Sequence, residues 1–161
     1  MDLQINCVLK DEEVILPKYE TEGAVGLDIR AYSYSEPSNL KVTKNIPFKG
    51  YTLKAHQRVL VKTGLFLEIP EGYEAQVRAR SGLALKSGIT VLNGIGTIDN
   101  DFRGEIGVIL INTSDKDFVI KPADRIGQLV FNEIKRVKFN VVDKLSETER
   151  GQGGYNSTGV K

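Results

Sequence analysis

The chain has 161 residues, 40% of them hydrophobic and 27% charged, which predicts a single domain with one sizeable core spanning 1–161. Its 22 basic and 21 acidic residues leave a formal net charge of +1 without a basic stripe, which argues against long nucleic acid as a partner. Neither a secretory signal nor a long apolar run is visible, so we expect a cytoplasmic protein with no membrane partner.

The first predicted element is a strand-like segment at residues 3–8. It contains Cys7, the single cysteine, which can form no intrachain disulfide and is expected to be a buried, inert thiol. Residues 32–50 are rich in Ser, Asn and Pro and predict a long loop, either a plain surface loop or a contact for another protein. His56 lies in a polar stretch, and we expect it to be exposed rather than part of a catalytic triad.

The rest of the chain has a mostly two-residue apolar period. In residues 73–79 apolar and polar side chains alternate, as in a strand with one dry and one wet face. Runs of branched residues predict further strands at 59–61, 106–111, 118–120, 129–131 and 139–142. The one credible helix is short, Ser81–Lys86, ending before Gly88. Many short strands predict an all-β fold of the sandwich, barrel or jelly-roll kind.

A turn-forming segment at 98–104 carries Asp99, Asp101 and Arg103. Because Asp and Asn favour turns, an ordinary hairpin turn is one interpretation. The other is catalytic: a carboxylate can take a proton from water beside a phosphate, and an aspartate on this rigid hairpin, Asp99, flanked by Ile98 and Phe102, suits that role.

Two further segments could bind phosphate. The first follows a strand and opens the helix: Arg80, Ser81 and Gly82. Free backbone amides at a helix start attract anions, and an arginine side chain can bind phosphate oxygens. An ordinary helix start capped by Ser81 explains these residues equally well. Residues 146–161 are polar and glycine-rich, as in a frayed tail, yet they hold Arg150 and hydroxyl groups. Glycine-rich backbone can wrap an anion closely. The C-terminal segment matches neither the P-loop nor the dinucleotide-binding pattern.

Five segments, taken together and in this order, resemble the trimeric dUTPase family: Gly26–Ala31, Arg80–Ile89, Asn93–Glu105, Asp124–Val130 and Arg150–Gly159. The resemblance covers nearly the whole chain. It implies a jelly-roll-like β-barrel or sandwich subunit, a homotrimer with active sites shared between subunits, and a flexible C-terminal arm at 146–161 that closes over a neighbouring site.

The resemblance also implies an activity: hydrolysis of dUTP to dUMP and pyrophosphate with Mg2+, which keeps uracil out of DNA and supplies dUMP for dTTP synthesis. Asp99 would be the general base, and Asp28 would hold waters of the Mg2+ shell. The implied uracil and deoxyribose contacts are Asn93, Gly96, Thr97, Ile98, Phe102 and Tyr155. The implied phosphate contacts are Arg80, Ser81, Gly82, Gln128, Arg150, Ser157 and Thr158.

The sequence departs from the family pattern at three positions. Phe102 stands where tyrosine is common, Asn156 where glycine is usual, and Gly127 where alanine is usual. Two rival interpretations remain: the related dCTP deaminases, which have a similar fold, and a nucleotide-binding module without activity. The hairpin favours the dUTPase pattern over the first, and the filled reactive positions argue against the second.

Overall fold

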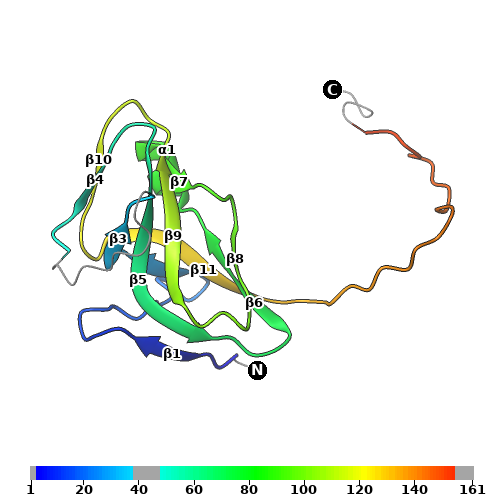
Figure 1. Cartoon of the computed structure of the whole chain (residues 1–161), viewed down its shortest axis with the longest axis horizontal. Coiled ribbons are helices and arrows are strands. Elements are labelled where there is room, and N and C mark those ends of the chain that lie inside the picture. The colour runs from blue at the N-terminus through cyan, green and yellow to red at the C-terminus, as the bar shows by residue number, and fades with distance from the viewer. Residues whose placement is uncertain (1–2, 38–47, 155–161) are drawn as a thin grey trace.

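The computed structural model describes residues 3–37 and 48–154, which form antiparallel sheets and one short helix. The elements are β1 (Asn6–Leu9), β2 (Leu27–Arg30), β3 (Ser33–Ser35), β4 (Tyr51–Leu53), β5 (Arg58–Glu68), β6 (Tyr73–Arg78), α1 (Ser81–Ser87), β7 (Ile89–Val91), β8 (Gly96–Ile98), β9 (Glu105–Asn112), β10 (Phe118–Ile120) and β11 (Arg125–Glu133). The predicted all-β, jelly-roll-like class is confirmed (Figure 1).

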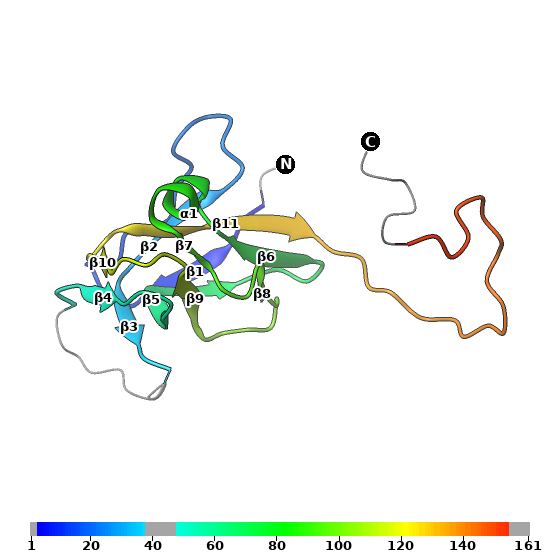
Figure 2. The ribbon, with the colours of Figure 1, turned by 90° about the horizontal axis from the view of Figure 1, so that it is seen from above.

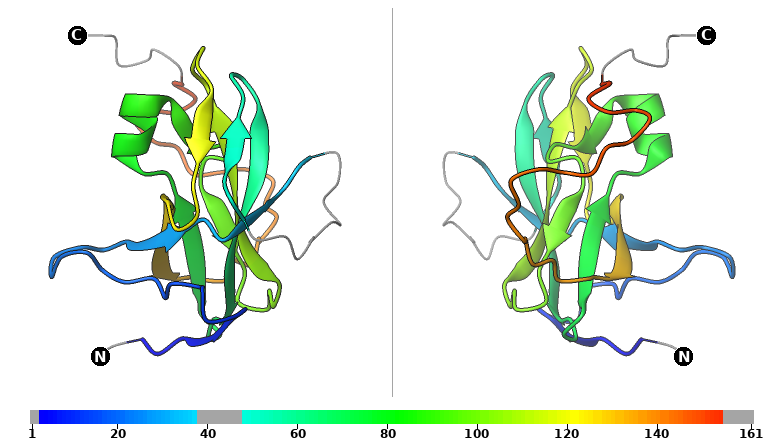
Figure 3. Two further views of the ribbon diagram at one scale, coloured as in Figure 1. Left: turned by 90° about the vertical axis from the view of Figure 1, so that its left-hand side faces the viewer. Right: turned by 90° about the vertical axis from the view of Figure 1, so that its right-hand side faces the viewer.

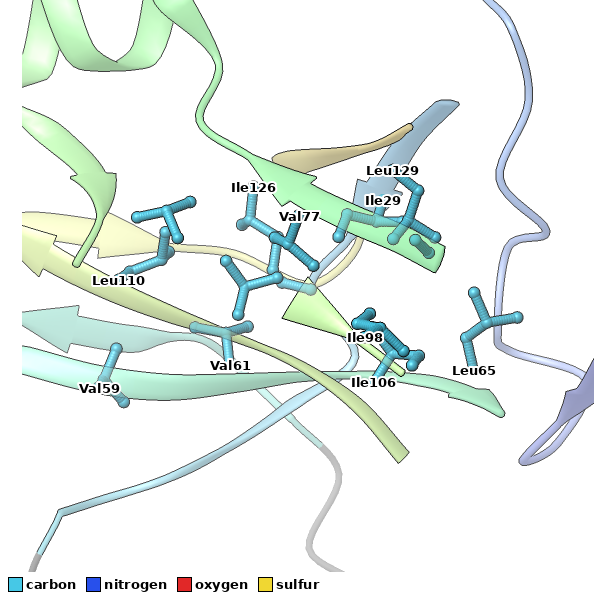
Figure 4. Close-up of a cluster of buried hydrophobic side chains, with 14 of the residues drawn as sticks. Ile29, Val59, Val61, Leu65, Val77, Ile98, Ile106, Leu110, Ile126 and Leu129 are labelled. Carbon is cyan, nitrogen blue, oxygen red and sulfur yellow. The ribbon is translucent and has the colours of Figure 1, made fainter. Parts of the chain in front are cut away.

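Two larger sheets build the domain. One has the strand order β1-β5-β9-β7, with β3 also paired to β5, and the other has the order β2-β11-β6-β8. A smaller sheet pairs β4 with β10. The core lies between the two larger sheets, where Val61 and Leu110 on one side approach Val77 and Leu129 on the other (Figure 4). All four side chains are at most 3% exposed.

The alternating pattern explains why these strands form. Along β9 every second residue is buried, so one face enters the core and the other meets solvent. Helix α1 ends at Ser87, one residue beyond the prediction, because Gly88 adopts φ 67° and returns its N–H to the carbonyls of Ala84 and Leu83. Ser81 does not cap the helix: Arg80 occupies the N-cap position without a side-chain cap bond.

Three sequence predictions were wrong. Cys7 is exposed, because β1 pairs with β5 alone among the described strands and all four of its residues face solvent. Residues 139–142 form no strand, because the segment after β11 runs away from the body with no neighbouring strand to pair with (Figures 1 and 2). The predicted loop 32–50 contains the strand β3, and its residues 38–47 lie outside the described residues.

His56 is exposed, as predicted, and its Nε2 lies 3.0 Å from Asp115 Oδ1. Across residues 3–37 and 48–154, no helix has the length and apolar character needed to cross a membrane.

Candidate active site

The predicted catalytic carboxylate emerges where β8 ends. Ile98, the last residue of β8, is 8% exposed and anchors the strand in the core. The chain then turns sharply, with the Phe102 N–H donating to the Asp99 carbonyl at 3.2 Å. Asp99 is therefore an exposed carboxylate held between a buried strand and a tight turn, which is the rigid presentation that the sequence suggested.

A cavity of about 330 Å³ opens beside this turn. Its lining includes every predicted nucleoside contact that the structure describes, together with Asp99: Asn93, Gly96, Thr97, Ile98 and Phe102. The volume is in the range of small-ligand sites. The lining also includes six residues of β5 and β9 to which the sequence gave no role in the site: Leu60, Lys62, Glu105, Ile106, Gly107 and Ile109. Tyr155 lies outside the described residues.

Two glycines bring backbone and side chains unusually close within this site. A Cβ on Gly96 would lie 3.2 Å from Asn93 Nδ2, so any larger residue would press on the Asn93 amide. A Cβ on Gly104 would lie 2.5 Å from the Phe102 ring, which therefore packs directly on the Gly104 backbone. The ring remains 45% exposed and presents an apolar surface to a ligand.

The predicted phosphate residues gather around a buried carboxylate at another place in the same sheet. Asp28, on β2, is 4% exposed. Its Oδ2 accepts a hydrogen bond from Arg125 Nη1 at 3.0 Å, and its Oδ1 accepts one from Gln128 Nε2 at 3.1 Å. Arg80 Nε lies 3.5 Å from Oδ1. A buried charge needs such partners, so Asp28 in turn fixes the Arg80 and Gln128 side chains.

Arg125 is a member of this cluster that sequence reasoning missed. Besides Asp28, it contacts Arg80, because the Arg80 Nη1 donates to the Arg125 carbonyl at 3.1 Å. The sequence signal that could have identified Arg125 is its position in the dUTPase-like segment Asp124–Val130, which also contains Gln128. Ser81 and Gly82 are exposed in the first turn of α1, next to Arg80.

The carboxylate and the phosphate cluster lie far apart within one chain. In the pairing of β6 with β8, Ala75 is opposite Ile98, so Asp99 lies level with Glu74. Arg80 follows Glu74 by six residues, which corresponds to about 20 Å at about 3.3 Å per strand residue. Figure 3 agrees, with the β8–β9 connection at one end of the molecule and α1 at the other. One phosphate group cannot contact Asp99 and Arg80 of the same chain.

The described residues contain no cluster of three or more His, Cys, Asp or Glu side chains that could bind a metal ion directly. Asp28 already interacts with three donor groups. Since a carboxylate offers about four acceptor positions, it has room for one water molecule. Asp28 therefore fits an outer-shell contact to a hydrated cation and does not fit direct coordination.

Of the predicted C-terminal contacts, Arg150 is the one within the described residues, and it is not brought to the site. The chain after β11 runs away from the body (Figure 1). In this segment Arg150 Nε donates to the Gly153 carbonyl at 2.9 Å. Asn156, Ser157 and Thr158 lie outside the described residues.

Comparison with known proteins gives consistent matches. A sequence model of the dUTPase family matches residues 12–159. The deoxyuridine 5'-triphosphate nucleotidohydrolase of Fusobacterium nucleatum is 50% identical over 152 residues, covering 94% of each chain. The protein of the same name from Chlamydia pneumoniae is 51% identical over 146 residues, covering 90% of this chain and 91% of its own.

Solved structures share the fold. The dUTPase of Staphylococcus bacteriophage 80alpha, as a mutant with dUpNHpp, superposes with a TM-score of 0.77 at 21% identity, covering 98% of this chain and 99% of its own. A mutant dUTPase of phage phi11 of S. aureus, described with a structural Mg(II) ion, gives a TM-score of 0.70 at 20% identity, covering 88% and 97%. With a family match across most of its length and relatives at half identity, the chain belongs to the dUTPase family.

Proposed function

We propose that the protein is a dUTP diphosphatase, which hydrolyses dUTP to dUMP and pyrophosphate. The observation that carries the proposal is the cavity that joins Asn93, Thr97 and Phe102 to the exposed carboxylate of Asp99. The relatives at about half identity, named deoxyuridine 5'-triphosphate nucleotidohydrolases, support the same substrate.

In the proposed reaction Asp99 accepts a proton from a water molecule. The water oxygen then attacks the α-phosphorus in line, the bond from that phosphorus to the α–β bridging oxygen breaks, and pyrophosphate leaves. A positioned general base typically contributes about 10²- to 10⁴-fold to the rate, so fixed charges around the triphosphate must supply much of the remainder.

Substrate selection would come from the hairpin. Asn93 and the backbone near Ile98 would bind the uracil edge, with Gly96 and Thr97 completing the wall. The Phe102 ring would pack beneath the deoxyribose and leave no room for a 2′-hydroxyl. Discrimination against UTP would then be steric rather than the result of a missing hydrogen bond.

The phosphates would be bound by Arg80, Ser81, Gly82 and Gln128 of a second copy of the chain. The separation of about 20 Å between Asp99 and Arg80 within one chain supports this division of the site. Mg2+ bound to the triphosphate would neutralise part of its charge and keep most of its waters, as this ion prefers. Asp28 would contact that hydration shell, in keeping with its one remaining acceptor position.

We propose that the protein forms a homotrimer. The extended segment after β11 supports an association between copies of the chain. Three apolar residues at alternating positions are largely exposed: Val137 by 74%, Phe139 by 94% and Val141 by 95%. A row of exposed apolar side chains of this kind is typical of a surface that binds another protein chain. An apolar groove of about 400 Å³ beside β1, where Cys7 lies, is a surface on another copy that this row could cover.

Replacing both Phe139 and Val141 with Asp is expected to dissociate the trimer, because two charges would enter an apolar contact. Sedimentation velocity measures the change. The matched control replaces Lys138 and Asn140, which alternate with them, by Asp and should remain trimeric. A trimer that tolerates Asp at both 139 and 141 contradicts this use of the segment.

The activity is tested by pyrophosphate release from dUTP, dTTP, dCTP and UTP in the presence of Mg2+. Release from dUTP alone supports the proposal. Ammonia release from dCTP would instead favour the deaminase interpretation, and dUTP binding without hydrolysis would favour a binding module.

A further inference from the structure

Glu105 is a largely buried carboxylate at the base of the nucleoside hairpin that has no role in the mechanism above. It begins β9 and lines the same cavity as Asp99 and Phe102. Its side chain is 12% exposed, and its Oε1 accepts a hydrogen bond from the Gly64 N–H at 2.9 Å. Its Oε2 lies 3.7 Å from Lys10 Nζ and 3.8 Å from Lys62 Nζ. The contacts join the returning arm of the hairpin to β5 and to the residue that follows β1.

Gly64, the hydrogen-bond partner of Glu105, lies in an irregular part of the β5 backbone. Opposite β9 the register shifts between Lys62, paired with Gly107, and Phe66, paired with Glu105. Three residues of β5 therefore face one residue of β9, which is a β-bulge, a feature frequently found beside active sites. Gly64 lies within it at φ 70°, a conformation that favours glycine.

The bulge is fixed from two sides. A Cβ on Gly64 would lie 2.4 Å from Val14 Cγ2 and 3.2 Å from Tyr32 Cγ, so these side chains cover its outer surface. On the β9 side, Thr63 Oγ1 donates to the Ile106 carbonyl at 2.8 Å. The Gly64 N–H is consequently a donor held in place, and the Glu105 carboxylate binds to a fixed point.

We propose that Glu105 is a positioning residue for the nucleoside hairpin, which sets the height of the Phe102 ring and so the discrimination between deoxyribose and ribose. Glu105 directly follows Gly104, whose backbone carries the Phe102 ring, so a shift of the first residue of β9 moves the surface under the sugar. This inference rests on the proposed dUTPase activity. Steric rejection of one hydroxyl depends on small displacements, because the excluded group must find no space at all.

The hydrogen bond to Gly64, rather than the charge, carries the positioning. The ion pairs at 3.7 and 3.8 Å are longer than hydrogen bonds, so they attract the carboxylate without fixing its direction. A backbone donor left without an acceptor in a part-buried site is costly, and the local chain would shift to satisfy it.

Three substitutions separate these effects. Glu105→Gln keeps the acceptor and removes the charge, and it should retain the kcat/KM ratio of dUTP to UTP within about twofold. Glu105→Asp keeps the charge but withdraws the acceptor by one methylene, and Glu105→Ala removes both. We expect Asp and Ala each to lower that ratio by about tenfold, through a larger kcat/KM for UTP as well as a smaller one for dUTP.

Val59→Ala is the matched control, because it removes buried methyl groups near the other end of β5 and should lower the melting temperature without changing the selectivity ratio. Unchanged selectivity in Glu105→Asp, or a loss in Glu105→Gln equal to that in Glu105→Asp, overturns the inference. If the wild-type protein leaves dUTP intact, the proposed function itself fails. If the wild type is active and the Glu105 variants keep its dUTP-to-UTP selectivity, only the role of Glu105 is refuted.

Discussion

The Asp99→Asn variant is expected to bind dUTP about as tightly as the wild type and to hydrolyse it about 10³-fold more slowly. The amide has nearly the shape of the carboxylate but cannot accept the proton of the attacking water. Since Asp99 is exposed at a turn closed by backbone hydrogen bonding, the substitution should not disturb the fold. Rapid-quench kinetics with dUTP and calorimetric titration with a non-hydrolysable analogue measure the two effects.

Asp101→Asn provides the control for this experiment. Asp101 is exposed in the same turn and carries the same charge, but it is not among the residues that line the nucleoside cavity. Its kcat should stay within about threefold of the wild type, since only the mean field of one exposed charge is lost. Equal losses in both variants would mean that the turn needs negative charge and that Asp99 is not the base.

A chain ending at residue 147 is expected to fold and to form the trimer but to lose nearly all turnover. The deletion leaves all three sheets and the apolar segment through Val142 in place. It removes Arg150 and, outside the described residues, Tyr155, Ser157 and Thr158. If these close over bound nucleotide and exclude water, the loss should fall mainly on kcat. Sedimentation, thermal unfolding and steady-state kinetics together test the expectation.

A second truncation, ending at residue 133 where β11 ends, distinguishes the two functions of the C-terminal region. It removes Phe139 and Val141 as well, so it should lose the trimer along with activity. An undiminished kcat in the 147-residue chain refutes closure by the arm, whereas a monomer at that length would extend the assembly contact beyond residue 147.

The strands of the core could be predicted because their signal is local. Alternation along residues 73–79 reflects one buried and one exposed face, and β6 forms there as expected. The same signal misled at Cys7, where β1 pairs with β5 but its four residues stay exposed, and at 139–142, where no strand among the described residues pairs with the segment. A two-residue period indicates that a segment has an apolar face, but it does not indicate which chain covers that face.

The sequence by itself determined the all-β class, the short helix, and the five matched segments from which Asp99, Asn93 and Arg80 could be named as site residues. The tertiary structure decided how they are arranged: Asp99 and Arg80 lie at opposite ends of β6. It also paired Arg125 with Asp28 across 97 positions of the chain. Such relations depend on strand register and on contacts between distant segments, which a pattern of neighbouring residues does not encode.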